Sequence, residues 1–146
     1  MPKDKDMPLT AQLRNEHDLL LGMADEMAAV ITPEPPHDLT PVFFLLARFN
    51  QLLHVHLARE DVIVYPPMIG GNDPHAAAVA TAFLNELATI DEQVQRFEST
   101  WTGGEVSSCW TDFCQDLREL VTSIRRRIER ENEELYPLLP EARKAA

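Results

Sequence analysis

Two short segments carry the side chains in this sequence whose types and spacing could bind a metal ion. In the first, residues 56–66, His56 and Glu60 lie four positions apart, so on a helix they occupy one face, one turn apart. The Tyr65-Pro66 pair that follows is expected to end that helix, because proline lacks an amide hydrogen and disfavours helical geometry in the preceding residue. An imidazole and a carboxylate on one face are both potential metal donors.

The second segment, residues 127–137, repeats the first at a constant offset. Arg59, Glu60, Tyr65 and Pro66 recur as Arg130, Glu131, Tyr136 and Pro137. One position breaks the repeat, because His56 corresponds to Arg127. The functional interpretation of the sequence depends on whether a metal site can form with arginine in place of histidine at position 127. The two tyrosines are expected to anchor the helix ends by packing, with a role in covering the polar residues as the alternative.

The elements that must position these residues are predicted by apolar side chains at helical spacing in four segments. The expected inward positions are Leu13, His17, Leu20, Ala24, Met27 and Ile31; then Val42, Leu46, Phe49, Leu53, His56, Glu60 and Ile63; then Phe83, Leu87, Ile90, Val94, Phe97 and Trp101; and then Phe113, Leu117, Leu120, Ile124, Arg127 and Glu131. Thr40-Pro41 and Asp73-Pro74 are predicted as capped helix starts. The connections are short, so the prediction is an all-α, antiparallel up-down-up-down four-helix bundle. It spans residues 9–140, between a flexible leader (1–8) and a tail (141–146).

Composition predicts one soluble domain. The chain has 146 residues, 45% of them apolar, which is enough for a single core. No apolar run approaches bilayer length and the first residues lack a signal-peptide core, so a cytoplasmic location is expected. The net charge of −11 argues against nucleic acid or an anionic membrane as a partner, since both require a basic surface.

Five of the expected inward positions are polar: His17, His56, Glu60, Arg127 and Glu131. Burying a charge without a partner is costly, so these side chains are expected to contact one another. Antiparallel packing can bring them into one cluster, and such a cluster inside a bundle is the usual location of a metal or cofactor.

On these residues the chain resembles the hemerythrin-like, or HHE cation-binding, family, whose members are four-helix bundles with a non-haem di-iron centre. The resemblance rests on Glu16-His17, on His56-x-x-x-Glu60 with Tyr65-Pro66, and on Glu131 with Tyr136-Pro137. It implies that His17 and His56 are histidine ligands, that Glu60 and Glu131 are bridging carboxylates, and that the metal is iron.

The chain departs from the family pattern at two places. Arg127 replaces the fourth-helix histidine, and the third-helix inward positions Leu87, Ile90 and Val94 offer no donor. Glu86 is close to them but is expected to face solvent, and whether it supplies a donor stays open. A guanidinium stays protonated and cannot bind a metal, but it could pair with both Glu60 and Glu131.

Three states of the cluster therefore remain possible: a metal-free polar core neutralised by Arg127, one metal ion on His17, His56, Glu60 and Glu131, or a complete di-iron centre. The preferred function is a non-enzymatic binding protein with a degenerate site. The alternative is a working non-haem iron protein for oxygen or nitric oxide binding, redox sensing, or oxidase or peroxidase activity. A diatomic ligand is expected only with iron, and a protein partner or a homo-oligomer is a further possibility.

Overall fold

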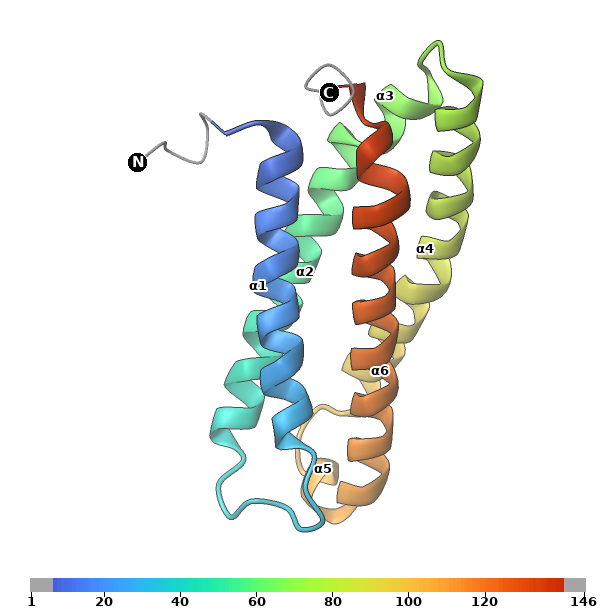
Figure 1. The fold of residues 1–146 in the computed structure, drawn as a ribbon. Coiled ribbons are helices and arrows are strands. Elements are labelled where there is room, and N and C mark those ends of the chain that lie inside the picture. The colour runs from blue at the N-terminus through green and yellow to red at the C-terminus, as the bar shows by residue number, and fades with distance from the viewer. Residues whose placement is uncertain (1–6, 141–146) are drawn as a thin grey trace.

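The computed structural model describes residues 7–140 and contains no β-strand in that range. Its four long helices are α1 (Leu9–Val30), α2 (Thr40–Ile63), α4 (Pro74–Thr100) and α6 (Trp110–Arg130). Successive long helices run in opposite directions and pack into one bundle, which confirms the predicted architecture (Figure 1). Two short helices, α3 (Tyr65–Ile69) and α5 (Glu105–Ser108), lie in the connections before α4 and α6. The fourth helix then continues as a π-helical turn, Glu131–Leu135, and a 3-10 turn, Tyr136–Leu138.

The start of α4 is capped as its sequence predicts. The Asp73 side chain accepts hydrogen bonds from the amides of His75 and Ala76, and Pro74 lies in the first turn. The start of α2 differs from the prediction, because Thr40 is already the first helical residue and makes no side-chain cap. Asp38 Oδ1 instead accepts the Thr40 amide at 3.0 Å, so the capping oxygen comes from two residues earlier.

The predicted polar residues lie between two apolar parts of the core. Along α1, Leu13 belongs to one apolar cluster and Leu20 to the other, with His17 between them. Leu53 in α2 and Val64, the residue that follows α2, belong to the two clusters in the same way, on either side of His56 and Glu60. The bundle therefore encloses a polar layer that apolar packing closes above and below.

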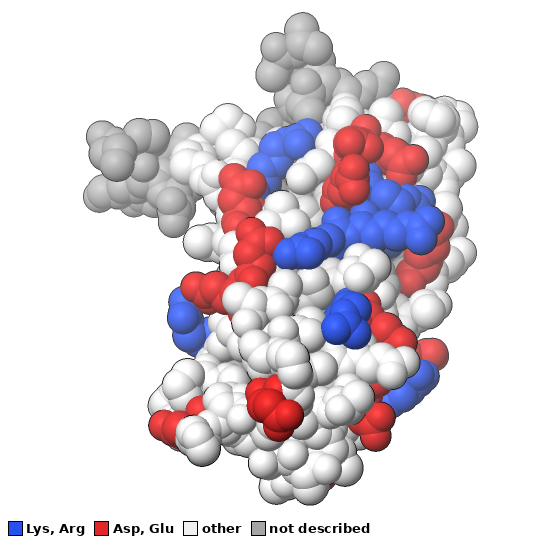
Figure 2. Space-filling view, turned by 60° about the horizontal axis from the view of Figure 1, so that its bottom comes forward, with Lys and Arg blue, Asp and Glu red and all other residues white. Residues whose placement is uncertain are grey.

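The ends of the predicted domain are described only in part. Residues 1–6 and 141–146 lie outside the described range, so the leader and the tail stay predictions. No helix within residues 7–140 combines the length and the apolar content that crossing a bilayer requires. On the face shown in Figure 2, basic and acidic side chains lie beside one another. This agrees with ion pairs such as Arg125 with Asp25 and Arg130 with Glu134.

Candidate metal centre

The structure brings the five predicted polar residues together. Their exposed fractions are 0% for His17, 2% for His56, 0% for Glu60, 6% for Arg127 and 2% for Glu131. One donor atom from each histidine and each glutamate lies within 4.8 Å of every other. The donors come from α1, from α2 and from the first residue of the π-helical turn, and α4 contributes none of them.

The separations of the donor atoms fit a single ion. His17 Nε2 lies 3.1 Å from His56 Nε2 and 2.8 Å from Glu131 Oε1. His56 Nε2 lies 3.3 Å from Glu60 Oε1 and 3.7 Å from Glu131 Oε1. Donors that each bind a metal at about 2.1 Å lie roughly 3.0–3.5 Å from one another in tetrahedral or octahedral geometry. Most of these contacts are already close to that range.

Both histidine rings are oriented by acceptors outside the cluster. His17 Nδ1 lies 2.8 Å from Asn132 Oδ1, and His56 Nδ1 lies 2.8 Å from Glu16 Oε1. Each Nδ1–H therefore donates outward and Nε2 faces the cluster, where it can donate to a carboxylate when protonated and can bind a metal when it is not. Glu16 is itself fixed, because its Oε2 accepts a hydrogen bond from Arg59 Nη1 at 2.5 Å.

Two buried atoms in the cluster have no hydrogen-bond partner: Arg127 Nη1, which is a donor, and Glu60 Oε1, which is an acceptor. Glu60 Oε1 is fully buried and accepts no hydrogen bond, while Glu60 Oε2 accepts one from the Tyr136 hydroxyl at 3.0 Å. A buried carboxylate oxygen without a donor is costly, and a cation satisfies it. With two imidazole nitrogens beside it, the donor set fits a borderline metal ion such as iron.

The charges inside the metal-free cluster are strongly coupled. Burial opposes protonation of His56, but its contacts with the carboxylates of Glu131 and Glu60, at 3.7 and 3.3 Å, and their charges outweigh burial and raise its pKa from 6.5 to about 10. Burial and then the charge of Glu131 raise the pKa of Glu60. For Glu131, burial is outweighed by the hydrogen bond from His17, the contact with His56 and the charge of Arg127, so its pKa is lowered. Glu131 is therefore the carboxylate that stays ionised.

Arg127 lies at one side of the cluster, on the oxygen of Glu131 that faces away from the histidines. Its Nε donates to Glu131 Oε2 at 2.9 Å and its Nη2 donates to the Tyr65 hydroxyl at 2.7 Å. The prediction that Arg127 pairs with both glutamates is thus wrong for Glu60, because Tyr65 takes the second hydrogen bond. The guanidinium also packs 4.7 Å from the Phe83 ring.

The third long helix offers no metal donor at this site. Leu87 is buried in the core, and the Phe83 ring packs against the guanidinium groups of Arg127 and Arg130, each 4.7 Å from its centroid. Glu86 is 46% exposed and pairs with Arg130, and its carboxylate lies 3.8 Å from Arg127 Nη1. The open question about Glu86 is answered by these contacts, because it binds arginines at the surface and stands outside the donor cluster.

Tyr136 belongs to the site, although packing at the helix end was the preferred interpretation. It is fully buried, and its hydroxyl oxygen lies 3.0 Å from His17 Nε2, 3.5 Å from His56 Nε2 and 3.5 Å from Glu131 Oε1. Burial and the neighbouring charges of Glu131 and Glu60 raise its pKa, so the metal-free phenol is neutral. The repeated Tyr-Pro pair pointed to this residue, but no sequence signal separated it from Tyr65.

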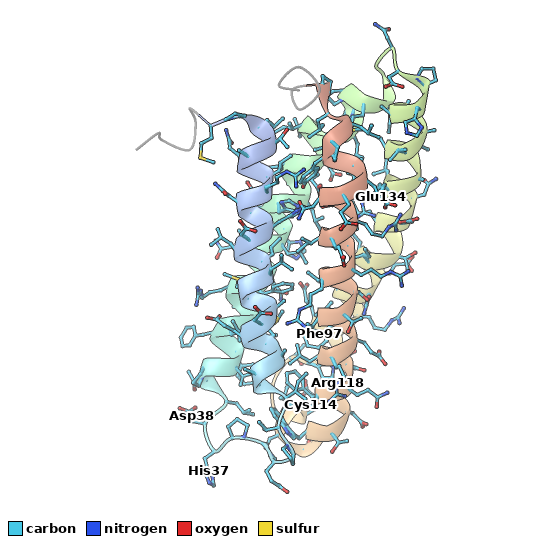
Figure 3. All side chains as sticks on the ribbon, in the orientation of Figure 1. His37, Asp38, Phe97, Cys114, Arg118 and Glu134 are labelled. Carbon is cyan, nitrogen blue, oxygen red and sulfur yellow. The ribbon has the colours of Figure 1, made fainter. Side chains whose placement is uncertain are left out.

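The remaining histidines lie elsewhere. His37 stands on the connection between α1 and α2 and points away from the bundle (Figure 3). His54 is on the exposed side of α2, where it pairs with Glu98, and His75 is exposed at the start of α4. None of the three joins the donor cluster.

The chain matches one known protein family over most of its length. Residues 8–139 match the model of the hemerythrin HHE cation binding domain. This chain belongs to that family. Comparison with curated proteins and with solved structures found no match. The HHE match covers all four long helices and all five residues of the polar cluster, which confirms the resemblance. The chain is therefore a cation-binding domain in the broad sense that the family description gives.

Proposed function

We propose that this HHE domain binds one iron ion through His17, His56, Glu60 and Glu131, and that Arg127 supplies the positive charge of a second metal ion. The observation that carries the proposal is the convergence of four donor atoms within 4.8 Å, one of them a buried carboxylate oxygen that accepts no hydrogen bond. The function is metal binding by a degenerate site, with no catalytic residue assigned.

The charge balance of the cluster favours one ion over two. Glu60 and Glu131 contribute two negative charges when both are ionised, and Arg127 contributes one positive charge next to Glu131. With both histidines neutral, as metal binding requires, one divalent ion changes the net charge of the cluster from −1 to +1, whereas a second would bring it to +3 in a buried site. Excess buried charge of that size is strongly unfavourable, and no donor on α4 compensates it.

The donor geometry also limits what can reach the metal. Every proposed ligand is at most 2% exposed, and apolar core packs on both sides of the layer. A substrate of ordinary size cannot contact an ion held there without opening the bundle. This supports binding or sensing over an oxidase or peroxidase activity on larger molecules.

A specific observation also favours a second candidate, the metal-free polar core. Arg127 is paired with Glu131 and Tyr65, and His56 with its raised pKa adds a further positive charge beside the glutamates. Protons and the guanidinium could then neutralise the site without a metal. The two candidates differ in whether iron displaces those protons.

Iron loading of two histidine variants tests the proposal. His56→Gln removes one donor, whereas His54→Gln changes an exposed histidine on the same helix and serves as the matched control. After anaerobic reconstitution with ferrous iron and desalting, we expect the wild type and His54→Gln to retain iron and His56→Gln to lose most of it. Equal retention by both variants, or none by the wild type, would overturn the proposal.

A further inference from the structure

The two tyrosines of this chain occupy matching positions in the repeat but make different contacts. The Tyr65 hydroxyl accepts a hydrogen bond from Arg127 Nη2 at 2.7 Å. The Tyr136 hydroxyl oxygen lies 3.0–3.5 Å from a side-chain nitrogen or oxygen of each of the four proposed ligand residues, and for Glu60 this atom is Oε2. One tyrosine therefore faces the internal cation and the other faces the metal donors.

The backbone after each glutamate accounts for this difference. After Glu60 the α-helix continues to Ile63, and Tyr65 begins the separate helix α3. After Arg130 the chain forms a π-helical turn that ends immediately before Tyr136. A π-helical turn contains an additional residue, so it rotates the residues that follow relative to an α-helix, and such turns are frequent at functional sites.

We propose that Tyr136 Oη is a fifth protein ligand of the iron. With four protein ligands, one coordination position would be open to a small external ligand, and Tyr136 fills that position here. This inference rests on the proposed function. The Tyr136 oxygen lies 3.0 Å from His17 Nε2 and 3.5 Å from both His56 Nε2 and Glu131 Oε1. These distances fall within the 2.8–3.7 Å that separate the donor atoms from one another, so the phenol oxygen could bind the same ion.

The hydrogen bonds of Tyr136 also show which group can accept the proton that its hydroxyl would release on binding iron. Binding of the phenol to ferric iron would break the O–H bond and form an iron–oxygen bond, with no change in oxidation state. Glu60 Oε2 already accepts the Tyr136 hydrogen bond at 3.0 Å, so it takes the proton first, and the proton then leaves to solvent. Glu60 Oε1 remains the oxygen that faces His56. The positive charge of the ion stabilises the phenolate in the same way that metals acidify bound water and thiols.

The test uses the ferric form of three proteins: wild type, Tyr65→Phe and Tyr136→Phe. A phenolate bound to ferric iron gives a visible charge-transfer band and enhanced tyrosine ring modes in resonance Raman spectra. We expect both signals in the wild type and in Tyr65→Phe, where Tyr136 is the one tyrosine left. Tyr136→Phe should retain iron, lose both signals, and bind azide at least tenfold more tightly because the position is open.

Each contrary result has a separate meaning. Iron bound to the wild type without the phenolate signals overturns the ligand assignment and leaves the proposed function intact. Signals that persist in Tyr136→Phe, or that vanish in Tyr65→Phe, overturn it as well. Should Tyr136→Phe fail to fold, the Raman spectrum of Tyr65→Phe decides alone. A wild type that binds no iron overturns both the proposed function and this inference.

Discussion

His56 links the charge of the metal-free cluster to the stability of the fold. Its ring is held between Glu16 on one nitrogen and the cluster carboxylates on the other, and its pKa is raised from 6.5 to about 10. The protonated ring therefore stabilises the folded metal-free protein below pH 6.5, and this contribution is lost as the pH rises through 10.

We therefore expect the free energy of unfolding of metal-free protein to fall between pH 6.5 and pH 10, by an amount on the order of a few kcal/mol. Urea unfolding at several pH values measures it. His56→Gln should remove most of the dependence, because glutamine carries no titrating proton. A wild type whose stability is flat over this range would contradict the assigned charge state.

The two buried glutamates should respond differently to neutralisation in the metal-free protein. Glu131→Gln leaves the buried Arg127 without its charged partner, so we expect a loss of about 3–5 kcal/mol. Glu60 has a raised pKa and no hydrogen bond to Arg127, so Glu60→Gln should cost about 1 kcal/mol. Equal losses in urea unfolding would show that Glu60 carries part of the Arg127 pairing after all.

Replacing Arg127 by histidine should increase iron binding, because it adds a donor and removes a competing cation. An affinity gain of at least tenfold, about 1.4 kcal/mol, is expected in a competition titration against a chelator. Arg126→His is the matched control, since Arg126 is exposed on the same helix. If both variants bind iron like the parent, Arg127 does not limit the metal site.

At the scale of elements, apolar spacing was sufficient to predict the four long helices and the five polar positions between them. A side chain that recurs at helical spacing must face the neighbouring helices, whichever fold they form. The Tyr136 position could not be predicted, because the repeat implies equal geometry after Glu60 and Glu131. No local pattern in the sequence indicates the π-helical turn that precedes Tyr136.

Helix starts were predicted in part, because Asp73 caps α4 as expected, whereas Asp38 rather than Thr40 supplies the capping oxygen at α2. Asp73 makes two hydrogen bonds to the first turn of α4, so Asp73→Ala should destabilise the protein by about 1 kcal/mol in thermal or urea unfolding. Asn72→Ala, at the exposed neighbouring loop residue, should stay within about 0.5 kcal/mol. A smaller effect at Asp73 than at Asn72 would place the cap elsewhere.

At the scale of the whole molecule, the polar layer joins elements that would otherwise pack through two separate apolar clusters. A metal held by α1, α2 and the π-helical turn connects three segments that are distant in the sequence. Iron that binds only the folded state therefore stabilises it, by about 2.7 kcal/mol when free iron is at 100 times its Kd.

The measurement that tests the central claim most directly is the iron content per chain after anaerobic reconstitution and removal of loosely bound metal, by elemental analysis. The account predicts close to one iron per chain, because the structure provides one set of converging donors and a guanidinium beside it. Two irons per chain would mean that Arg127 leaves the cluster and that a second set of donors forms. No iron would mean that the layer is a metal-free polar core.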